Sequence, residues 1–350
     1  MDPLLKHMVD ITTHRDHTML DLSAISAVQE LACALRTRLL SIYLHRDQIC
    51  VMPKASISQM QAATIEEGLD PAQDGEPISN YPALANCIAQ TLPNAEHVAE
   101  DGMRTLWLPI WIKDKASVCL EITNPTPYTA QTTQIISGIV SVYRNFQNLL
   151  DYSERDALTG LLNRKTFDDQ LAKMIASNGE QELAASLPEN EERRQKNLEQ
   201  KHWLAVIDVD HFKRVNDQFG HLYGDEVLIL IANLLQTSFR ANDRVFRFGG
   251  EEFVVLLRST TYENARKIIE RFRANVEAHA FPQIGQITVS VGFVSVSAYE
   301  SPVVILGHAD QALYYAKTHG RNLVCHYDEL VNEGQLATTT SNDTAEFFFD

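Results

Sequence analysis

Two carboxylates end one apolar segment of the sequence. The run Leu204-Ala-Val-Ile-Asp-Val-Asp210 has the composition of a buried strand and ends in Asp208 and Asp210, with one residue between them. Because side chains alternate across a strand, both carboxylates are expected on the same face. A buried carboxylate is costly unless it is paired or binds a cation, and carboxylate oxygens are ligands that Mg²⁺ prefers. The alternative interpretation is a helix cap or a salt bridge.

A glycine pair followed by two acidic residues is the second candidate, in Arg247-Phe-Gly-Gly-Glu-Glu-Phe253. Gly249 and Gly250 lie between two apolar alternating segments, which predicts a tight hairpin turn with positive φ. Since glycine has no Cβ, backbone amides in such a turn can approach a phosphate closely. Glu251 and Glu252 are then expected at the hairpin tip, either as functional carboxylates or as solvated charges of an ordinary turn.

Two further segments carry groups that suit a nucleotide. Asn216 and Asp225 supply an amide and a carboxylate, which can match the donors and acceptors of a guanine edge, and Asp225 is also expected to cap the helix that follows it. Lys317 and Arg321 flank Gly320 at the end of another predicted helix. These two cations either complement the helix dipole or hold a polyphosphate.

Together these residues resemble the diguanylate cyclases of the GGDEF family. Gly249-Gly-Glu-Glu-Phe253 is a variant of the family signature, and the resemblance covers about residues 156–327. The other motifs, in order along the chain, are Asp156-Ala-Leu-Thr-Gly-Leu161 with Asn163-Arg164, Asp208-Val-Asp-His-Phe-Lys213, Asn216 through Asp225, and Lys317 with Arg321. A five-residue match alone could be chance, so the assignment depends on the whole ordered set.

The resemblance implies a palm-like α/β domain that condenses two GTP molecules into cyclic di-GMP and releases two pyrophosphates. It implies Mg²⁺, with Mn²⁺ as an alternative, and no organic cofactor. By resemblance, the metal ligands are Asp208, Glu251 and the Val209 carbonyl, and the catalytic residues are Glu251, Glu252 and Lys213. The resemblance also implies that Asn216, His221 and Asp225 lie at the guanine and that Gly249 and Gly250 form the turn against which the nucleotide lies. Lys317 and Arg321 are implied to face the phosphates. His211 departs from the family pattern and is interpreted as a surface histidine.

A product-inhibition site is also implied by resemblance. Arg240-Ala-Asn-Asp243 is an RxxD motif that ends shortly before Gly249, and Arg271 matches a secondary arginine of that site. At this offset the motif resembles the family's binding site for cyclic di-GMP. The alternative is a surface ion pair, because RxxD alone is common by chance.

Residues 1–128 are predicted to form a mixed α/β domain. We expect a helix from Leu20 to Leu40, and strand pairs at 41–45 with 48–52 and at 104–112 with 116–122. The order of elements resembles the end of a GAF domain, which implies a sensor for an unknown small ligand or a dimerisation module. His14-Arg-Asp-His17 could bind a metal, but solvated histidines are the preferred interpretation; His45 with Cys50 carries no pattern that demands a haem.

Residues 129–155 are predicted to be a connecting helix. Ile135, Ile139, Val142, Phe146 and Leu149 recur at spacings of 4, 3, 4 and 3, as in a short parallel coiled coil. The favoured hypothesis is a homodimer through helix 130–152, and the alternative is an amphipathic helix that packs on its own domain. The domain at 156–328 is expected to be a sheet covered by helices, with a polar surface insertion at 176–200 and a disordered tail at 329–350 that contains Phe347-Phe-Phe349.

Composition limits the class of protein. The 350 residues carry a formal charge of −16, which argues against a nucleic-acid binder or an anionic-membrane binder, because these need a basic surface. The longest apolar runs are far below the roughly 18 residues of a membrane span. Five scattered cysteines predict buried thiols in a reducing cytoplasm. Two rival hypotheses remain, a catalytically inactive nucleotide-binding module and a scaffold that acts through its first domain.

Overall fold

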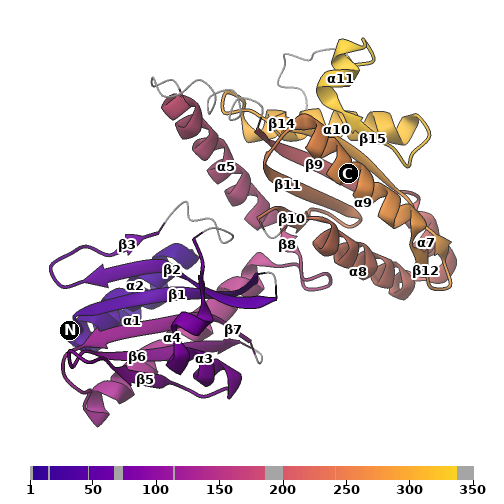
Figure 1. The fold of residues 1–350 in the computed structure, drawn as a ribbon. Helices are drawn as coiled ribbons and strands as arrows, with labels where there is room; N and C mark the ends of the chain where they lie inside the picture. The colour runs from indigo at the N-terminus through magenta and orange to yellow at the C-terminus, as the bar shows by residue number, and fades with distance from the viewer. Residues whose placement is uncertain are drawn as a thin grey trace. The chain divides into compact units, whose positions relative to one another are not determined.

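The computed structural model describes residues 3–14, 16–45, 47–66, 74–112, 115–185, 200–240 and 242–336. The chain divides into two compact units, Met1–Ser153 and Glu154–Asp350, which are described separately. Figure 1 labels the helices and strands. Within the described residues, no helix is both long and apolar enough to cross a membrane.

The first unit is built on an antiparallel sheet, which in the described part of the unit has the order β3-β2-β1-β7-β6-β5, with β4 paired to β2 (Figure 1). The strands are β1 (Arg36–His45), β2 (Gln48–Ser58), β3 (Thr64–Ile65), β4 (Glu76–Pro77), β5 (Ala95–Val98), β6 (Arg104–Ile112) and β7 (Lys115–Asn124). Both expected strand pairs are confirmed, since β1 pairs with β2 and β6 pairs with β7.

Helices cover both faces of this sheet. They are α1 (Pro3–Thr13), α2 (His17–Leu31), the 3-10 helix η1 (Ile78–Asn80), α3 (Pro82–Ala89) and α4 (Ala130–Glu154). On one face, Ile25 of α2 and Ile139 of α4 share a buried cluster with Leu120 of β7. On the other face, Leu84 of α3 packs in a cluster with Trp107. The unit is therefore a sheet between two helical layers.

The helix expected from Leu20 to Leu40 ends earlier, at Leu31. Cys33 has a φ of +49°, and from Arg36 the chain forms β1, which pairs with β2 on one side and β7 on the other. Leu39, which matched the helical spacing, is instead a buried strand residue. The prediction was wrong because strand pairing on both sides outweighs a helical spacing of apolar residues.

Helix α4 packs on its own unit through one side. Ile139 is 2% exposed and Tyr143 is 1% exposed, whereas Leu149 is 60% exposed. The five positions of the expected seam therefore differ in environment, and Ile139 is already covered within a single copy of the chain. This is the amphipathic helix of the alternative interpretation. Pairing of α4 with a second copy stays a prediction.

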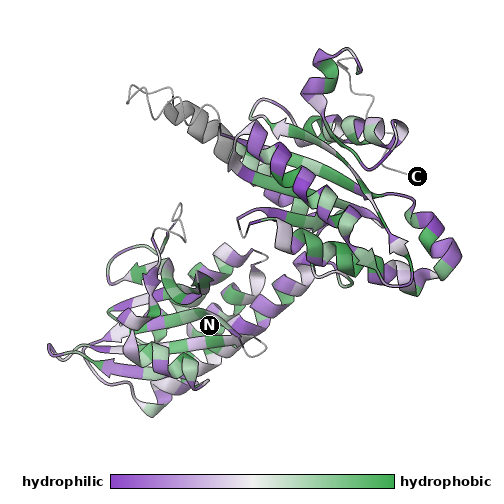
Figure 2. Ribbon diagram, turned by 45° about the vertical axis from the view of Figure 1, so that its right-hand side comes forward, coloured by the Kyte–Doolittle hydropathy of each residue, from purple (hydrophilic) through white to green (hydrophobic). Residues whose placement is uncertain are grey.

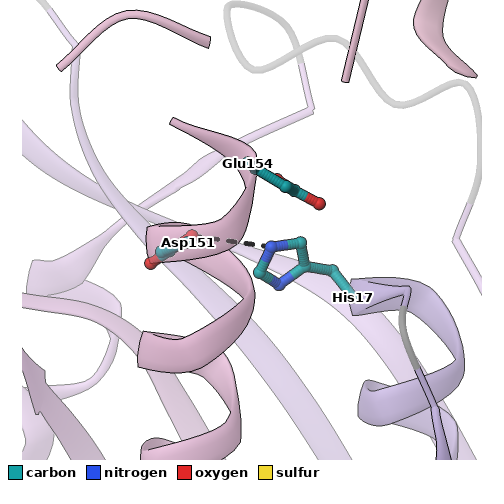
Figure 3. Close-up of side chains that lie close together, drawn as sticks. All are labelled: His17, Asp151 and Glu154. Carbon is teal, nitrogen blue, oxygen red and sulfur yellow. Dashed lines mark ion pairs between the residues drawn. The ribbon is translucent and has the colours of Figure 1, made fainter. Parts of the chain in front are cut away.

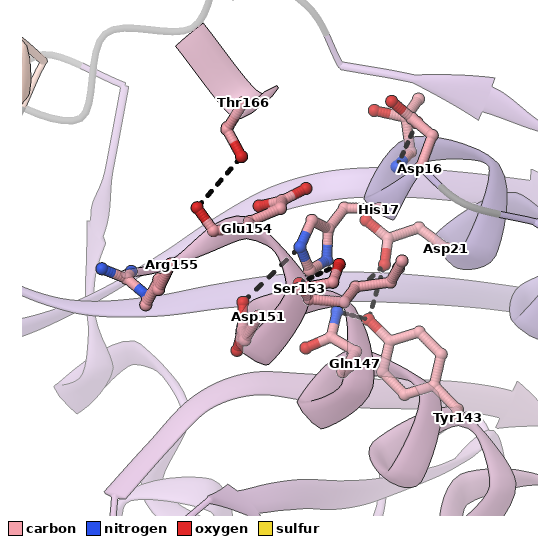
Figure 4. Close-up of polar contacts among 12 residues, drawn as sticks. Asp16, His17, Asp21, Tyr143, Gln147, Asp151, Ser153, Glu154, Arg155 and Thr166 are labelled. Atoms are coloured by element: carbon pink, nitrogen blue, oxygen red, sulfur yellow. Dashed lines mark hydrogen bonds and ion pairs between the residues drawn. The ribbon is translucent and has the colours of Figure 1, made fainter. Parts of the chain in front are cut away.

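Polar contacts join α2 to α4 (Figure 4). Tyr143 donates to Asp21 Oδ1 at 2.5 Å, Gln147 donates to the Tyr143 oxygen at 2.5 Å, and Lys54 Nζ lies 2.6 Å from Asp21 Oδ2. Burial, followed by the charge of Asp21, raises the pKa of Tyr143 well above its usual value. Because these buried groups satisfy one another, hydrogen bonds as well as apolar contacts determine the position of α4.

His17 does not have the fully solvated side chain that was expected. Its Nε2 lies 3.5 Å from Asp151 Oδ1, and the imidazole is 26% exposed (Figure 3). Glu154, the last residue of α4, brings a third ligand atom, and the three atoms lie within 4.8 Å of one another. Partly exposed acidic groups are common without an ion, so we assign no metal to these residues.

The second unit is built on a mixed sheet, which in the described part of the unit has the order β15-β14-β9-β11-β10-β8 (Figure 1). Its strands are β8 (Leu162–Asn163), β9 (Lys201–Val209), β10 (Arg244–Arg247), β11 (Glu252–Thr260), β14 (Val289–Val296) and β15 (Val324–His326), with a separate pair β12 (Ala280–Phe281) and β13 (Gly285–Gln286). Its helices are α5 (Arg164–Ala185), α7 (Phe212–Phe219), α8 (His221–Ser238), α9 (Tyr262–Ala278), α10 (Pro302–Thr318) and α11 (Tyr327–Asn332).

Strand β9 lies between β11 and β14 and is covered on both faces. Ala205 and Ile207 belong to the cluster that contains residues of α8 and α9, whereas Leu204 and Val206 belong to the cluster that contains residues of α5 and α10. A strand buried on both faces is apolar throughout, and the strands of this sheet are largely hydrophobic in Figure 2. The expected sheet covered by helices and the hairpin around 244–257 are both confirmed.

The end of the second unit differs from the expectation. A disordered tail was predicted from residue 329, but α11 continues to Asn332 and Leu330 is buried. Burial of Leu330 explains the difference, because a short helix with one apolar anchor can pack on the domain. Residues 186–199 of the predicted insertion and residues 337–350, with the Phe-rich end, lie outside the described residues.

Candidate functional site

The end of β9 and the tip of the β10–β11 hairpin meet at one edge of the second sheet. Asp208 lies opposite Glu252 in the antiparallel register of β9 and β11. The Val209 amide donates to the Glu251 carbonyl at 3.3 Å. Acidic residues that are far apart in the sequence therefore come together where the strands end.

A lysine from α10 completes this acidic cluster. Lys317 Nζ lies 2.8 Å from Asp208 Oδ2, and Asp208 is 5% exposed. Burial raises the pKa of Asp208; Lys317 opposes that shift, and the charges of Glu252 and Asp210 add to it. Burial and then the charge of Asp208 likewise raise the pKa of Glu251. Carboxylates in this environment are stabilised by a cation.

The donor set at this edge fits a hard divalent cation. Asp208 and Glu251 offer carboxylate oxygens, and Val209 offers a backbone carbonyl at the end of the same strand. Mg²⁺ and Mn²⁺ prefer such oxygen ligands. Burial is the main reason that the pKa values of the two acids are raised, and neighbouring acids add to it, so a bound cation would stabilise both carboxylates.

Gly249 has a different role from the one predicted for the glycine pair. Neither Gly249 nor Gly250 has a positive φ, so the prediction of left-handed glycines was wrong. A Cβ on Gly249 would lie 2.7 Å from Oε2 of Glu252, whereas a Cβ on Gly250 would meet nothing within 4 Å. The turn is closed by a hydrogen bond from the Phe248 amide to the Glu252 carbonyl, at 2.8 Å. Gly249 therefore permits the close approach of the Glu252 side chain, which a local turn pattern does not reveal.

An ion pair holds the hairpin tip. Arg247 Nη1 donates to both carboxylate oxygens of Asp156, at 3.0 and 3.2 Å, and its Nη2 donates to the Gly250 carbonyl at 2.9 Å. Burial opposes ionisation of Asp156, but hydrogen bonds from Thr159 and Arg247 outweigh burial and lower the pKa of Asp156. The motif at 156–161, which had no assigned role in the sequence, thus positions the turn that carries Glu251.

The residues predicted at the guanine come from α7 and the start of α8. A Cβ on Gly224 would lie 2.0 Å from Asn216 Oδ1, so the Asn216 side chain packs directly on Gly224, next to Asp225. His221 and Asp225 are exposed. Asp225 is not the helix cap that was expected, because α8 begins four residues earlier, at His221, after Gly220.

Three further predicted residues lie at the surface. Lys213 on α7 and Arg321 after α10 have exposed side chains. His211 is exposed, as expected, and has a φ of +60° in the turn between β9 and α7. The structure places all three near an end of β9 or of α10, the elements that carry Asp208 and Lys317.

The residues of the RxxD motif gather where α8 ends. Asp243 is 9% exposed, and its carboxylate accepts hydrogen bonds from the amides of Arg240, at 3.0 Å, and Arg258, at 3.2 Å. Arg271 of α9 donates to the Ser238 carbonyl at 2.7 Å. Asp243 thus stabilises the turn through the backbone amide of Arg240, whereas the Arg240 side chain is exposed.

Two further residues lie near the acidic cluster: Arg164, which was named in the sequence only as part of a motif, and Asp310, which was not singled out. The Arg164 guanidinium lies 4.6 Å from the centre of the Phe248 ring. Asp310 precedes Lys317 by two turns on α10, and burial, with a contribution from Asp208 and opposition from Lys317, raises its pKa. The sequence did contain a signal for Asp310, because its seven-residue spacing from Lys317 places both residues on one face of a helix.

The end of β9 and the tip of the β10–β11 hairpin lie within a region that matches a known protein family. Residues 153–323 match the family model described as "Diguanylate cyclase, GGDEF domain". The diguanylate cyclase DgcP of Pseudomonas aeruginosa is 44% identical over 170 residues, which are 48% of this chain and 23% of DgcP. The diguanylate cyclase VdcA of Vibrio cholerae is 26% identical over 292 residues, which are 81% of this chain and 79% of VdcA.

A solved structure is also similar to part of the chain. The coiled coil and GGDEF domain of DgcB from Caulobacter crescentus, in complex with c-di-GMP, has 27% identity and a TM-score of 0.48; the match covers 56% of this chain and 97% of that one. The curated relatives differ in length: this chain spans 23% of DgcP and 42% of DgcM from Escherichia coli, but 79% of VdcA.

Proposed function

We propose that this chain condenses two molecules of GTP into cyclic di-GMP, because residues 153–323 match the family model of the GGDEF diguanylate cyclase domain. The observation that carries the proposal is the gathering of Asp208, Glu251, Glu252 and Lys317 at one sheet edge, inside the region that matches the family. The names of DgcP and VdcA support the same activity.

The acidic cluster suits a metal-dependent phosphoryl transfer. Asp208, Glu251 and the Val209 carbonyl would hold Mg²⁺, or Mn²⁺ in its place. When bound, the ion neutralises phosphate charge and acidifies a coordinated hydroxyl. A Glu251 carboxylate oxygen accepts the proton of the attacking 3′-hydroxyl, and Glu252 supports the metal and ribose end from across the hairpin.

The remaining residues bind and orient GTP. Asn216 and Asp225 hydrogen-bond the guanine edge, with His221 beside them. Lys213, Lys317 and Arg321 balance the charge of the polyphosphate. The nucleotide lies against the backbone at Gly249 and Gly250. The contact of Asn216 with Gly224 supports the guanine assignment, because it fixes the amide next to Asp225.

Each catalytic domain holds one GTP, so the reaction needs two copies. We assign the pairing to helix 130–152, whose exposed Leu149 supports this assignment, and a GAF-like sensor role to the first unit, whose ligand is a small molecule. Product inhibition at Arg240, Asp243 and Arg271 completes the proposed regulation. The exposed Arg240 side chain beside a buried Asp243 supports it.

The direct test is to incubate the purified full chain with GTP and Mg²⁺ and to separate the products by HPLC. We expect cyclic di-GMP and two equivalents of pyrophosphate. Binding of GTP without turnover, in protein freed of bound product, would instead support an inactive nucleotide-binding module. If a folded dimer neither bound GTP nor converted it, the result would support a protein that acts as a scaffold.

A further inference from the structure

Asp210, the carboxylate directly after β9, has surroundings unlike those of Asp208, which lies on the strand. It is 5% exposed, and its carboxylate accepts three hydrogen bonds. The Thr288 hydroxyl donates to Oδ2 at 2.7 Å, the Ser290 hydroxyl donates to Oδ1 at 2.7 Å, and the Asn322 amide donates to Oδ2 at 3.0 Å. Hydrogen bonds to a carboxylate are among the stronger ones in proteins, so Asp210 is held firmly.

The turn that Asp210 contacts carries one of the proposed phosphate-binding residues. After α10 the chain passes through Gly320, Arg321 and Asn322, with φ values of +118°, +61° and +49°. Two of these three are not glycine, and left-handed backbone is unfavourable for such residues. The conformation therefore needs support from the rest of the fold.

Asn322 supplies that support through both its backbone and its side chain. Its backbone N–H donates to Asp210. In addition, its Oδ1 accepts from Arg273 Nη1 at 2.6 Å and its Nδ2 donates to Glu277 Oε1 at 2.8 Å. The residue is thus tied to the end of β9 on one side and to α9 on the other. Arg321, one residue earlier, is positioned by these contacts.

We propose that Asp210 is a positioning residue for polyphosphate recognition: through the Asn322 amide it holds the left-handed turn that directs Arg321 toward the phosphates of GTP. Asp210 then contributes to substrate affinity without touching substrate or metal. Asp208, on β9, then binds the metal, whereas Asp210, directly after β9, positions the loop. This inference depends on the proposed function.

The chemistry of the three hydrogen bonds provides a discriminating pair of variants. In Asp210→Asn, the amide oxygen can accept from Thr288 and Asn322 while the NH₂ group donates to the Ser290 hydroxyl, which can rotate to accept. The turn is then retained although the negative charge is lost. Asp210→Ala removes the acceptor and releases the Asn322 amide.

The test measures KM for GTP and kcat at saturating GTP and Mg²⁺. Asp210→Ala should raise KM about tenfold, and Asp210→Asn should restore KM to within about threefold of the wild type. Ser290→Ala, which removes a bond to Asp210 but none to the turn, is the matched control and should leave KM unchanged. Thermal unfolding of each variant identifies any loss of folded protein, which would lower kcat rather than raise KM.

A double-mutant cycle with Arg321→Ala tests the route of the effect. If Asp210 acts through Arg321, Asp210→Ala should raise KM less than twofold in the Arg321→Ala background. Additive effects would overturn the proposal, and so would a loss of activity in Asp210→Asn as large as in Asp208→Asn, since that would indicate a metal ligand. A wild-type chain that makes no cyclic di-GMP would contradict the proposed function itself, which is a separate outcome.

Discussion

The ammonium group of Lys317 lies 2.8 Å from the carboxylate of Asp208. The pair joins α10 to the end of β9, and burial with neighbouring acids raises the pKa of Asp208 even in the presence of this lysine. The pair thus connects the proposed metal site to the proposed phosphate site.

Asp208→Asn should lower kcat by at least about 100-fold, because the amide removes the charge on which metal binding depends. Chelation of Mg²⁺ from the wild type should cause the same loss, reversed by added Mg²⁺. Rates are measured as cyclic di-GMP formed, by HPLC. Asp169→Asn, an exposed site on α5, is the control. Retention of more than a tenth of the activity in Asp208→Asn would contradict the assignment of this residue.

Gly224→Ala should raise KM for GTP about tenfold or more. The new Cβ would lie 2.0 Å from Asn216 Oδ1, so the Asn216 side chain must move away from the guanine. The fold should be retained, because the Asn216 side chain can rotate and alanine favours a helix, but the ring of Phe212, 3.1 Å from the new Cβ, must also shift by a few tenths of an ångström. Gly138→Ala on α4, where a Cβ meets nothing within 4 Å, is the matched control. An unchanged KM for GTP would remove Asn216 from the guanine site.

Arg240→Ala should weaken product inhibition by tenfold or more, as an order of magnitude for a lost charge-assisted contact. The measurement is the concentration of cyclic di-GMP that halves the rate, each variant being compared with its own uninhibited rate. Arg266→Ala, an arginine that pairs with Glu329 at the surface, is the control. If the half-inhibiting concentration stays the same, the RxxD motif is only the turn that Asp243 stabilises.

Leu149→Asp tests pairing through α4 more directly than a substitution at the buried Ile139 would. Leu149 is 60% exposed, so a charge there should spare the fold, weaken association and lower the rate per chain most at low protein concentration. Light scattering after size exclusion gives the oligomeric state, and Asn148→Asp adds the same charge at the neighbouring exposed position. Ile139→Asp instead buries a charge in the first unit and should cost about 3 kcal/mol or more of stability. A concentration-independent rate for Leu149→Asp would exclude pairing at this position.

His202 should make stability depend on pH. Burial, followed by the charge of Arg258, lowers the pKa of His202 from 6.5 to about 4, and its Nδ1 accepts from the Ser259 amide at 2.8 Å. The unfolded chain therefore binds the proton more tightly than the folded chain, so stability falls as pH drops from about 6.5 to about 4. Between pH 7 and pH 5, protonation of His202 should lower the free energy of unfolding by on the order of 2 kcal/mol.

Chemical unfolding at the two pH values measures this effect. His202→Asn should reduce the difference between them by about that amount, whereas His211→Asn, at an exposed histidine, should leave it as in the wild type. An equal pH dependence in wild type and His202→Asn would show that this histidine is not held neutral.

Several elements follow from local patterns. The hairpin at Arg247–Phe253 and the apolar strand that carries Asp208 each depend on residues close together in the chain, and each is present. The helix predicted at 20–40 was wrong in its second half, because that part of the chain forms β1, which pairs with β2 and β7 from outside the segment.

The candidate site was recognisable as a set of residue types but not as an arrangement. The sequence offered two equivalent carboxylates in Asp208 and Asp210, and only the fold distinguishes them, since one meets Lys317 and the other meets Thr288, Ser290 and the Asn322 amide. Likewise, the close approach of Glu252 explains Gly249, and no spacing rule contains that contact.

The amino-acid order alone thus determined the chemistry available to this protein: acidic groups, amides and cations at spacings that match one family, on a chain able to form two units. The tertiary structure decided which partner each group has, that Ile139 is covered within one copy, and that the two aspartates at the end of β9 have different partners. The physical reason is that propensity and periodicity act over a few neighbouring residues, whereas burial and hydrogen bonding join groups that are far apart along the chain.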